Sequence, residues 1–397
     1  MSTSDQIELT TKTEIFFSKL CHIAYLHGFP NLWITDLNFS KTFKKYHFII
    51  YKTLDVIFYL FIISQWTASL KQHNLTQKQM SDNLLFSYAQ PSLYSYRLAL
   101  DYHQDKIREI IFNVFVKLKG LHNDEKLEKK MIRKTTILSL VFLTMVCSCL
   151  VFFGCQGIYA DDAKFVTVIT IWPDVEDTRL VAYLGRVVIY IIWWLLIMNV
   201  MASYNAVLTL MVTLEYQFKY LGKYFRELDL IFEEDISQKE KERKYYEGVK
   251  LGISLHSIIL RCVELTQDSC TNVYGLHILV NISVLVSVMF QMVYTGRDLD
   301  SVFSTLATGT AMLISTGYFM WCAGDVTVEA SFLATDMYFS GWHNCGENAP
   351  RVRRLLILAM MQAQNPVEIT IMGVFTVSYQ AFLSIVKSSY TIFTVLY

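Results

Sequence analysis

Residues 369–397 read ITIMGVFTVSYQAFLSIVKSSYTIFTVLY, and Lys387 is the one charged side chain among these 29 residues. A run this long and this apolar is typical of a helix that crosses the hydrocarbon core of a bilayer, which takes about 20 residues. We therefore expect the last part of the chain to be a membrane span. A span at this position also helps to fix the side of the membrane on which each preceding loop lies.

The composition of the whole chain indicates that its solvent is a bilayer. Hydrophobic residues make up 53% of the 397 residues and charged residues only 18%, less charge than a soluble chain of this size normally carries. The apolar residues gather in blocks, and the sequence therefore predicts an all-α polytopic membrane protein with seven transmembrane helices. Besides residues 369–397, the expected spans are residues 46–70, 83–97, 135–160, 180–214, 269–296 and 302–324.

The second expected span is the weakest by composition. It contains Pro91 and reaches the length of a span only when Arg97 is included. Taken alone, it could also be a re-entrant or surface helix. We count it as a span because the distribution of charge requires a seventh crossing.

Lysine and arginine residues mark the cytoplasmic side of a membrane protein. With the N-terminus in the cytoplasm, 26 of the 35 Lys and Arg residues fall in cytoplasmic segments and five in extracellular segments. Seven crossings then place the C-terminus outside the cell. The glycosylation sequon at Asn74 falls in the first extracellular loop, as this orientation requires. Seven spans also occur in G-protein-coupled receptors, but those have the opposite orientation. A metabotropic seven-helix receptor is therefore kept only as the alternative mechanism.

The expected spans contain none of the sequence patterns of a catalytic centre. They hold no paired carboxylates, no HExxH or GxSxG sequence and no Walker A sequence. The eight cysteines are scattered, without the spacing of a zinc site. We expect neither an enzyme nor a bound cofactor or metal, and no nucleic-acid partner.

Residues 369–397 carry a narrow stripe of small and hydroxyl-bearing side chains when they are projected on a helix. Hydroxyl groups can replace part of the hydration of an ion, and an apolar ring can close a pore by dewetting. The pattern therefore fits a pore-lining helix in an oligomer, and a tight seam between packed helices is the alternative. From the inner to the outer end, the stripe consists of Ala381, Ser384, Ser388, Thr391 and Val395.

The outer halves of the middle spans are rich in aromatic and soft side chains, with few polar groups among them. This composition suits a cavity for a small apolar ligand that is oriented by one or two hydrogen bonds. Ordinary packing and lipid-facing aromatic residues are the alternative. The side chains that we expect to line the cavity are Ser148, Phe152, Tyr183, Val187, Tyr190, Ile191, Leu306 and Thr310.

Three stretches near the end of the chain give it a resemblance to a known family. They read YFMWCAGDVTVEASFLATDMYFSGW at residues 318–342, MQAQNP at residues 361–366 and FLSIVKSSYTIFTVL at residues 382–396. They resemble the insect odorant receptors, whose pattern is an aromatic-Cys-x-Gly-(Asp/Asn) stretch, a helix ending near Gln-Pro and a final helix with Ser-Tyr-(Ser/Thr). Elsewhere the chain is similar to that family only in length, number of spans and topology.

The resemblance implies a function, a set of partners and a location. Members of the family are ligand-gated, non-selective cation channels in the plasma membrane of olfactory sensory neurons. A variable subunit binds a small volatile odorant and assembles with a shared co-receptor, most simply as a tetramer, whose terminal helices line the pore. The resemblance also implies that Val395 is the outer hydrophobic gate.

The chain departs from the co-receptor in two places. It lacks the co-receptor's long insertion between spans four and five and the longer tail beyond the gate. We therefore expect an odorant-tuned subunit, and an insect gustatory receptor channel is the alternative within the same fold.

The expected organisation has three parts. Residues 1–324 hold six transmembrane helices and the ligand cavity, residues 325–368 form a cytoplasmic anchor that contacts other subunits, and residues 369–397 form the pore-lining helix. Residues 341–350 read as a loop, after which an amphipathic helix begins at about Pro350. The apolar face of that helix includes Leu355 and Leu358, which are the expected subunit contacts.

Overall fold

The computed structural model of the protein describes residues 11–73, 75–121, 124–159, 164–294, 299–346, 349–371, 373 and 375–396. Ten α-helices and one short hairpin are found in these residues. The helices are α1 (Lys12–Leu26), α2 (Lys41–Lys71), α3 (Gln77–Tyr102), α4 (Gln104–Phe112), α5 (Glu125–Tyr159), α6 (Leu180–Glu227), α7 (Gln238–Tyr294), α8 (Leu299–Tyr338), α9 (Ala349–Ala363) and α10 (Tyr379–Leu396). The hairpin consists of β1 (Thr370–Ile371) and β2 (Phe375–Thr376).

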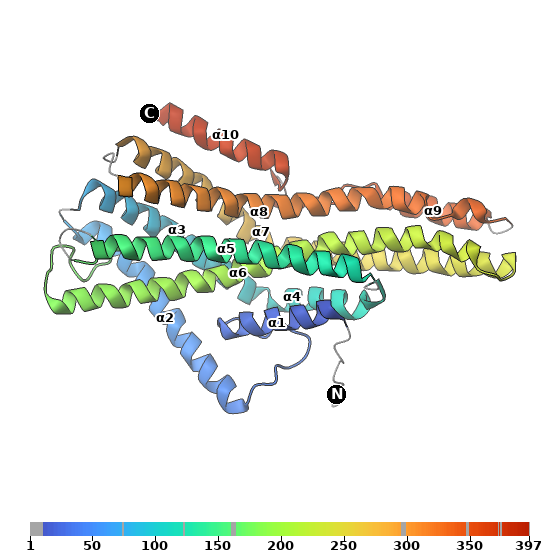
Figure 1. Cartoon of the computed structure of the whole chain (residues 1–397), viewed down its shortest axis with the longest axis horizontal. Coiled ribbons are helices and arrows are strands. Elements are labelled where there is room, and N and C mark those ends of the chain that lie inside the picture. The colour runs from blue at the N-terminus through green and yellow to red at the C-terminus, as the bar shows by residue number, and fades with distance from the viewer. Residues whose placement is uncertain are drawn as a thin grey trace.

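Most of the helices run along one long axis, and the two ends of the molecule differ (Figure 1). The α2–α3 and α5–α6 connections lie at one end, where α10 also finishes, whereas α6, α7, α8 and α9 extend together to the other end. With 48 and 57 residues, α6 and α7 are much longer than a bilayer requires. The additional length is polar: α6 continues past residue 214 to Glu227, and α7 begins at Gln238, well before the apolar block at residues 269–296.

The core of the molecule is centred on the C-terminal half of α6. Val207, Met211, Val212, Leu214 and Leu221 of this helix are completely buried. They lie where α6 is surrounded by α5, α7 and α8, the helices with which it makes extensive contacts. This packing holds the helices that also form the cavity described below.

Length and composition alone mark some of these helices as membrane spans. Within the described residues, α2, α5 and α6 are each long and apolar enough to cross a membrane. In α7, the segments Gln238–Cys270 and Gly275–Phe290 meet the same criteria together, although the helix is bent by 52° between them.

The weak second span is an uninterrupted helix despite the proline inside it. α3 runs for 26 residues through Pro91. Because proline has no N–H group, the carbonyl oxygen of Ser87 loses its partner within the helix. The indole Nε1 of Trp66 in α2 donates to that oxygen at 2.5 Å. A neighbouring helix thus satisfies the group that the proline leaves free.

Arg97 is accommodated in α3 by ion pairing with the adjacent helix. Its side chain is buried and pairs with the carboxylate of Asp55 in α2, which also accepts a hydrogen bond from Tyr94 at 2.9 Å. The guanidinium group donates as well to the carbonyl oxygen of Gly28 at 3.1 Å. A charged side chain within a span is tolerated when it is paired in this way.

Arg186 fixes the loop that covers one end of the bundle. Its guanidinium group donates to the carbonyl oxygens of Lys164 and Asp177, both at 2.6 Å. The carbonyl oxygen of Ser64 in α2 accepts a hydrogen bond from the backbone N–H of Ile171 at 3.0 Å, and Gln72, directly after α2, donates to the carbonyl oxygen of Thr170 at 2.9 Å. Residues 164–179 are therefore bound to two separate helices.

The last helix begins ten residues later than the sequence predicts. β1 and β2 form an antiparallel hairpin, and Gly373 lies at its turn with a φ of +69°. Glycine tolerates this left-handed conformation, and β-branched residues such as Thr370 and Ile371 favour strands. The remaining 18 residues of α10 make a helix about 27 Å long, close to the thickness of the hydrocarbon core.

The expected boundary between residues 324 and 325 falls inside a helix. α8 is continuous for 40 residues, so the sixth span and the first part of the anchor are one rigid element. The predicted loop after it is confirmed, since a short turn at Trp342–Asn344 precedes the start of α9 at Ala349.

Candidate functional site

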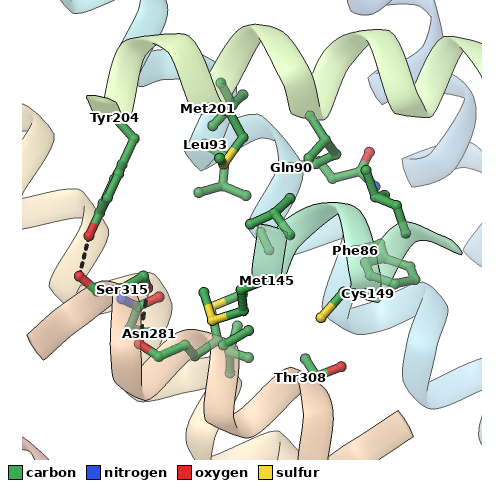
Figure 2. A pocket seen from close by; sticks show the side chains of 18 of the residues that line it. Phe86, Gln90, Leu93, Met145, Cys149, Met201, Tyr204, Asn281, Thr308 and Ser315 are labelled. Carbon is green, nitrogen blue, oxygen red and sulfur yellow. Dashed lines mark hydrogen bonds between the residues drawn. The ribbon is translucent and has the colours of Figure 1, made fainter. Parts of the chain in front are cut away.

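A cavity of about 150 Å³ lies between α3, α5, α6, α7 and α8 (Figure 2). Its wall is almost entirely apolar, because the five helices turn aromatic, aliphatic and sulfur-containing side chains toward it. An engineered cavity of about 150 Å³ is known to hold benzene, so the space fits a molecule of about one ring. The apolar wall includes Leu85, Phe86, Leu93, Phe142, Met145, Val146, Leu150, Phe153, Trp193, Ile197, Val200 and Met201.

Gln90 of α3 is the most conspicuous polar side chain in this wall. It is only 2% exposed, and both its amide oxygen and its amide nitrogen lack a hydrogen-bond partner among the described residues. Leaving a buried polar group unpaired costs about 1–3 kcal/mol. A molecule in the cavity that carries a donor or an acceptor would remove this penalty.

One end of the cavity is formed by a hydrogen-bonded polar cluster. The hydroxyl of Tyr96 lies 3.1 Å from Nδ1 of His277, and Nε2 of His277 lies 2.9 Å from the amide nitrogen of Asn281. Tyr204 donates from its hydroxyl to the carbonyl oxygen of Ser315 (Figure 2). These contacts occupy most of the polar groups at this end. The cluster therefore holds helices α3, α6, α7 and α8 in place around the cavity.

A wider groove adjoins the cavity between α5 and α8. It encloses about 1010 Å³, and Met145, Cys149 and Ala311 line both the groove and the cavity. Four of the eight side chains that we expected around the ligand line this groove and not the cavity itself. They are Ser148, Phe152, Leu306 and Thr310.

The other four expected side chains lie near the N-terminal end of α6, outside the linings of the cavity and the groove. The hydroxyl of Tyr190 donates to the carbonyl oxygen of Leu150 at 2.7 Å, and its ring packs on Phe165. Tyr183 and Ile191 are exposed, and Val187 is half-buried. The α6 side chains that do reach the cavity lie further along the helix, namely Trp193, Ile197, Val200, Met201 and Tyr204.

One feature of the sequence points to the polar group in the cavity. Gln90 is an isolated amide in the uncharged stretch 83–96, directly before Pro91. A polar side chain at such a place in a membrane helix faces the protein interior more often than the lipid.

On α10, most of the expected pore stripe is exposed in the single chain. Ser384, Ser388 and Thr391 are exposed, and Val395 is 78% exposed. Ala381, which the projection placed in the stripe, is instead buried with Ile385 and Ser389. The side of α10 that packs on α7 and α8 is thus adjacent to the stripe and includes its innermost position.

Two hydroxyl groups of the stripe direct their hydrogen atoms toward the backbone of their own helix. Ser384 donates to the carbonyl oxygen of Gln380 at 3.1 Å, and Thr391 donates to that of Lys387 at 2.9 Å. With their hydrogen atoms directed back to the helix, these hydroxyls present oxygen lone pairs outward. Such oxygens can accept a cation or a water molecule.

The two expected contact residues of α9 differ in their surroundings. Leu358 is 65% exposed, whereas Leu355 is half-buried and packs against the core. Ile357 and Met361 are also exposed, so Leu358 belongs to an apolar surface. The predicted glycosylation site at Asn74 lies outside the described residues.

Long helices around an apolar cavity, several of them long and apolar enough to cross a bilayer, are the architecture of a polytopic membrane protein. Residues 91–390 match the family model described as 7tm Odorant receptor, and the chain therefore belongs to the insect odorant receptor family. The resemblance seen in the sequence is confirmed by this match.

Individual relatives agree with this assignment. Odorant receptor 10 of Aedes albopictus is 31% identical over 78 residues, which are 20% of each chain. Odorant receptor 42a of Drosophila melanogaster is 25% identical over 155 residues, which are 39% of this chain and 37% of that protein. In both cases the matched part spans well under two thirds of the relative's own length.

Solved structures show the same fold. The insect olfactory receptor OR5 from Machilis hrabei in complex with eugenol has a TM-score of 0.76 at 15% sequence identity, over 97% of this chain and 98% of that chain. A second structure of that receptor has a TM-score of 0.75 at 14% identity, over 96% and 97% of the two chains. The prediction of an all-α membrane protein with seven transmembrane helices is thereby confirmed.

Proposed function

We propose that the chain is the odorant-binding subunit of a ligand-gated, non-selective cation channel, and that the odorant binds in the cavity beside Gln90. The observation that carries the proposal is an apolar cavity whose wall holds an amide without a partner among the described residues. Such a site selects a mostly apolar molecule with a single hydrogen-bonding group. The eugenol complex of the Machilis hrabei receptor, which shares the fold, supports a small organic ligand of this kind.

In this proposal the groove between α5 and α8 is the route by which the odorant arrives. Small apolar molecules partition into a bilayer, and the groove is open where the cavity is more enclosed. The side chains of Met145, Cys149 and Ala311 stand between the two spaces. Four of the side chains expected around the ligand would then contact it on entry, before it reaches its final site.

The pore in this proposal is formed by the α10 helices of a tetramer that includes co-receptor subunits. Support comes from the exposed stripe that ends in Val395, and from hydroxyl oxygens that are free to accept cations. A single helix cannot enclose a pore, so several terminal helices must surround an axis, and a tetramer supplies four of them. Odorant binding opens the pore if the odorant binds the open arrangement of the helices more tightly than the closed one.

We also propose that the N-terminus is cytoplasmic and the C-terminus extracellular, in the plasma membrane of olfactory sensory neurons. The excess of Lys and Arg in the segments assigned to the cytoplasm supports this orientation. So does the position of α10, which finishes at the same end of the bundle as the α5–α6 connection (Figure 1). An epitope after residue 397 should stain on intact cells. Staining only after permeabilisation would exclude the orientation.

The experiment that tests the function is electrical. Cells that express this chain together with a co-receptor are exposed to a panel of single-ring and short-chain odorants while the membrane current is recorded. We expect at least one odorant to open a cation current that persists in excised membrane patches, where soluble messengers are lost. A response that disappears on excision would support a metabotropic receptor instead.

A further inference from the structure

A second cavity lies on the other side of Met201 from the proposed odorant site. It encloses about 210 Å³ and is bounded by α1, α4, α5 and α6, with parts of α3 and the loop after α1. We propose that this inner cavity is a separate binding site for a small neutral alcohol. The proposal goes beyond the odorant site and concerns a different set of residues.

The two cavities are distinct spaces with one wall in common. Among the described lining residues, Met201 is the one that both linings include. The inner cavity takes Met198, Asn205 and Leu210 from α6, whereas the outer cavity takes Trp193, Ile197, Val200 and Tyr204 from that helix. α1 and α4 contribute only to the inner one.

The wall of the inner cavity selects for an uncharged, mainly hydrocarbon molecule. Phe17, Leu20, Ile107 and Leu143 are among its apolar residues, and no Asp, Glu, Lys or Arg lies among the described residues that line it. His27, the one imidazole there, already has its Nδ1 atom 2.8 Å from the carbonyl oxygen of Ile23. A charged ligand would find no counter-ion in such a cavity.

Asn205 supplies the polar contact that distinguishes an alcohol from a hydrocarbon. Its side-chain oxygen is buried and has no hydrogen-bond partner among the described residues. An amide oxygen accepts hydrogen bonds and cannot donate them, so its partner must bring a donor. A hydroxyl group on a short carbon chain provides that donor and fills the apolar remainder of the space.

The test uses the purified full chain in lipid nanodiscs and a medium-chain alcohol that carries a photoreactive diazirine. After illumination, the labelled residues are located by mass spectrometry. We expect labels on α1 and on residues 198–210 of α6, and we expect unlabelled octanol to compete about three- to tenfold more strongly than octane, as one hydrogen bond implies. Labelling confined to residues 306–314 of the groove, or equal competition by octane, would overturn the proposal.

Two variants make the same chemical change in the two cavities. Asn205→Leu removes the inner amide and should abolish the preference for octanol over octane on the inner peptides. Gln90→Leu removes the outer amide and should leave that preference intact. A preference that survives Asn205→Leu contradicts the proposal.

If Asn205→Leu does not fold, Ala24→Leu serves in its place. Ala24 lines the inner cavity on α1, so a larger side chain there takes up space and should reduce the inner labelling. Unchanged labelling in this variant also contradicts the proposal. Because no odorant current is measured, the inner site and the proposed channel function succeed or fail independently.

Discussion

The hydroxyl of Tyr379, the first residue of α10, donates a hydrogen bond to the carboxylate of Asp325 in α8. The same carboxylate pairs with Lys134 of α5 at 2.5 Å, and Lys134 also pairs with Glu215 of α6. The proposed pore helix is therefore joined, at its first residue, to three helices that also form the cavity. This polar cluster is one structural connection between the two proposed sites, beside the direct packing of α10 on α7 and α8.

Two substitutions test how much this connection stabilises the fold. Tyr379→Phe removes one charge-assisted hydrogen bond and should lower the free energy of unfolding by about 1 kcal/mol. Asp325→Ala removes that bond and the ion pair with Lys134, so the loss should be larger. The measurement is the apparent melting temperature of the purified variants in detergent. Equal melting of wild type and Tyr379→Phe would show that the contact is not formed in solution.

Gln90→Leu should weaken odorants that carry a hydrogen-bonding group and spare those that do not. The expected loss of potency is about three- to tenfold, which corresponds to one hydrogen bond. Dose–response curves for an odorant and its hydrocarbon analogue measure the difference. Gln65→Leu is the matched control, because Gln65 is also a buried, unpaired amide among the described residues but does not line the cavity. Equal effects of both substitutions would remove Gln90 from the site.

Cys149→Phe should obstruct the proposed passage from the groove to the cavity. The phenylalanine ring is larger than the thiol that it replaces and lies where the groove meets the cavity. The odorant-evoked current should therefore begin more slowly and require more odorant. Val151→Phe adds a similar ring on the same helix, but facing the groove alone, and should change potency by less than the first substitution. Rapid solution exchange with current recording gives both quantities. Identical onset in Cys149→Phe and wild type would place the entrance elsewhere.

Val395→Ser should raise the current that flows without odorant and change the ion permeability. A polar side chain in place of the apolar one at the last position of the stripe favours a pore that is filled with water. The effect of a single subunit should be partial, since co-receptor subunits supply the other positions of the ring. Leu383→Ser, at another exposed apolar position on a different side of α10, is the control. If basal current and permeability match the wild type at equal surface level, Val395 is not the gate.

Leu358→Asp should reduce co-purification with the co-receptor. The side chain lies on the exposed apolar surface of α9, so a charge there disturbs a contact without disturbing the core. Leu251→Asp, at an exposed position on α7, is the control and should leave co-purification unchanged. Leu355 is a poorer choice, because it packs against the core and a charge there should impair folding. Normal co-purification of Leu358→Asp would locate the interface elsewhere.

The coarse fold could be predicted from the sequence because hydropathy and charge report directly on the membrane. The spans and the loop before α9 follow from where apolar blocks and charged residues begin and end. The start of α10 could not be predicted in this way. Residues 369–378 are apolar whether they form a strand or a helix, and Gly373 was the one local sign of a turn.

The cavity wall was harder to predict because a membrane helix is apolar on every side. Periodicity separates a buried face from a polar one, and α6 offers no such contrast around Tyr183 and Tyr190. The α6 side chains that we selected lie nearer the N-terminal end of the helix than Trp193 and Ile197, which line the cavity. On α5 and α8 the side chains that we selected lie nearer the cavity, since Ser148 and Thr310 line the groove that adjoins it.

Met201 is the one described side chain that lines both cavities, and its thioether group is flexible. A molecule that displaces this side chain from either direction alters the room left on the opposite side. Affinities on the two sides are then linked, and the linkage must be equal in both directions. If both proposed sites bind their ligands, the response to a blend of two odours should therefore differ from the sum of the responses to each.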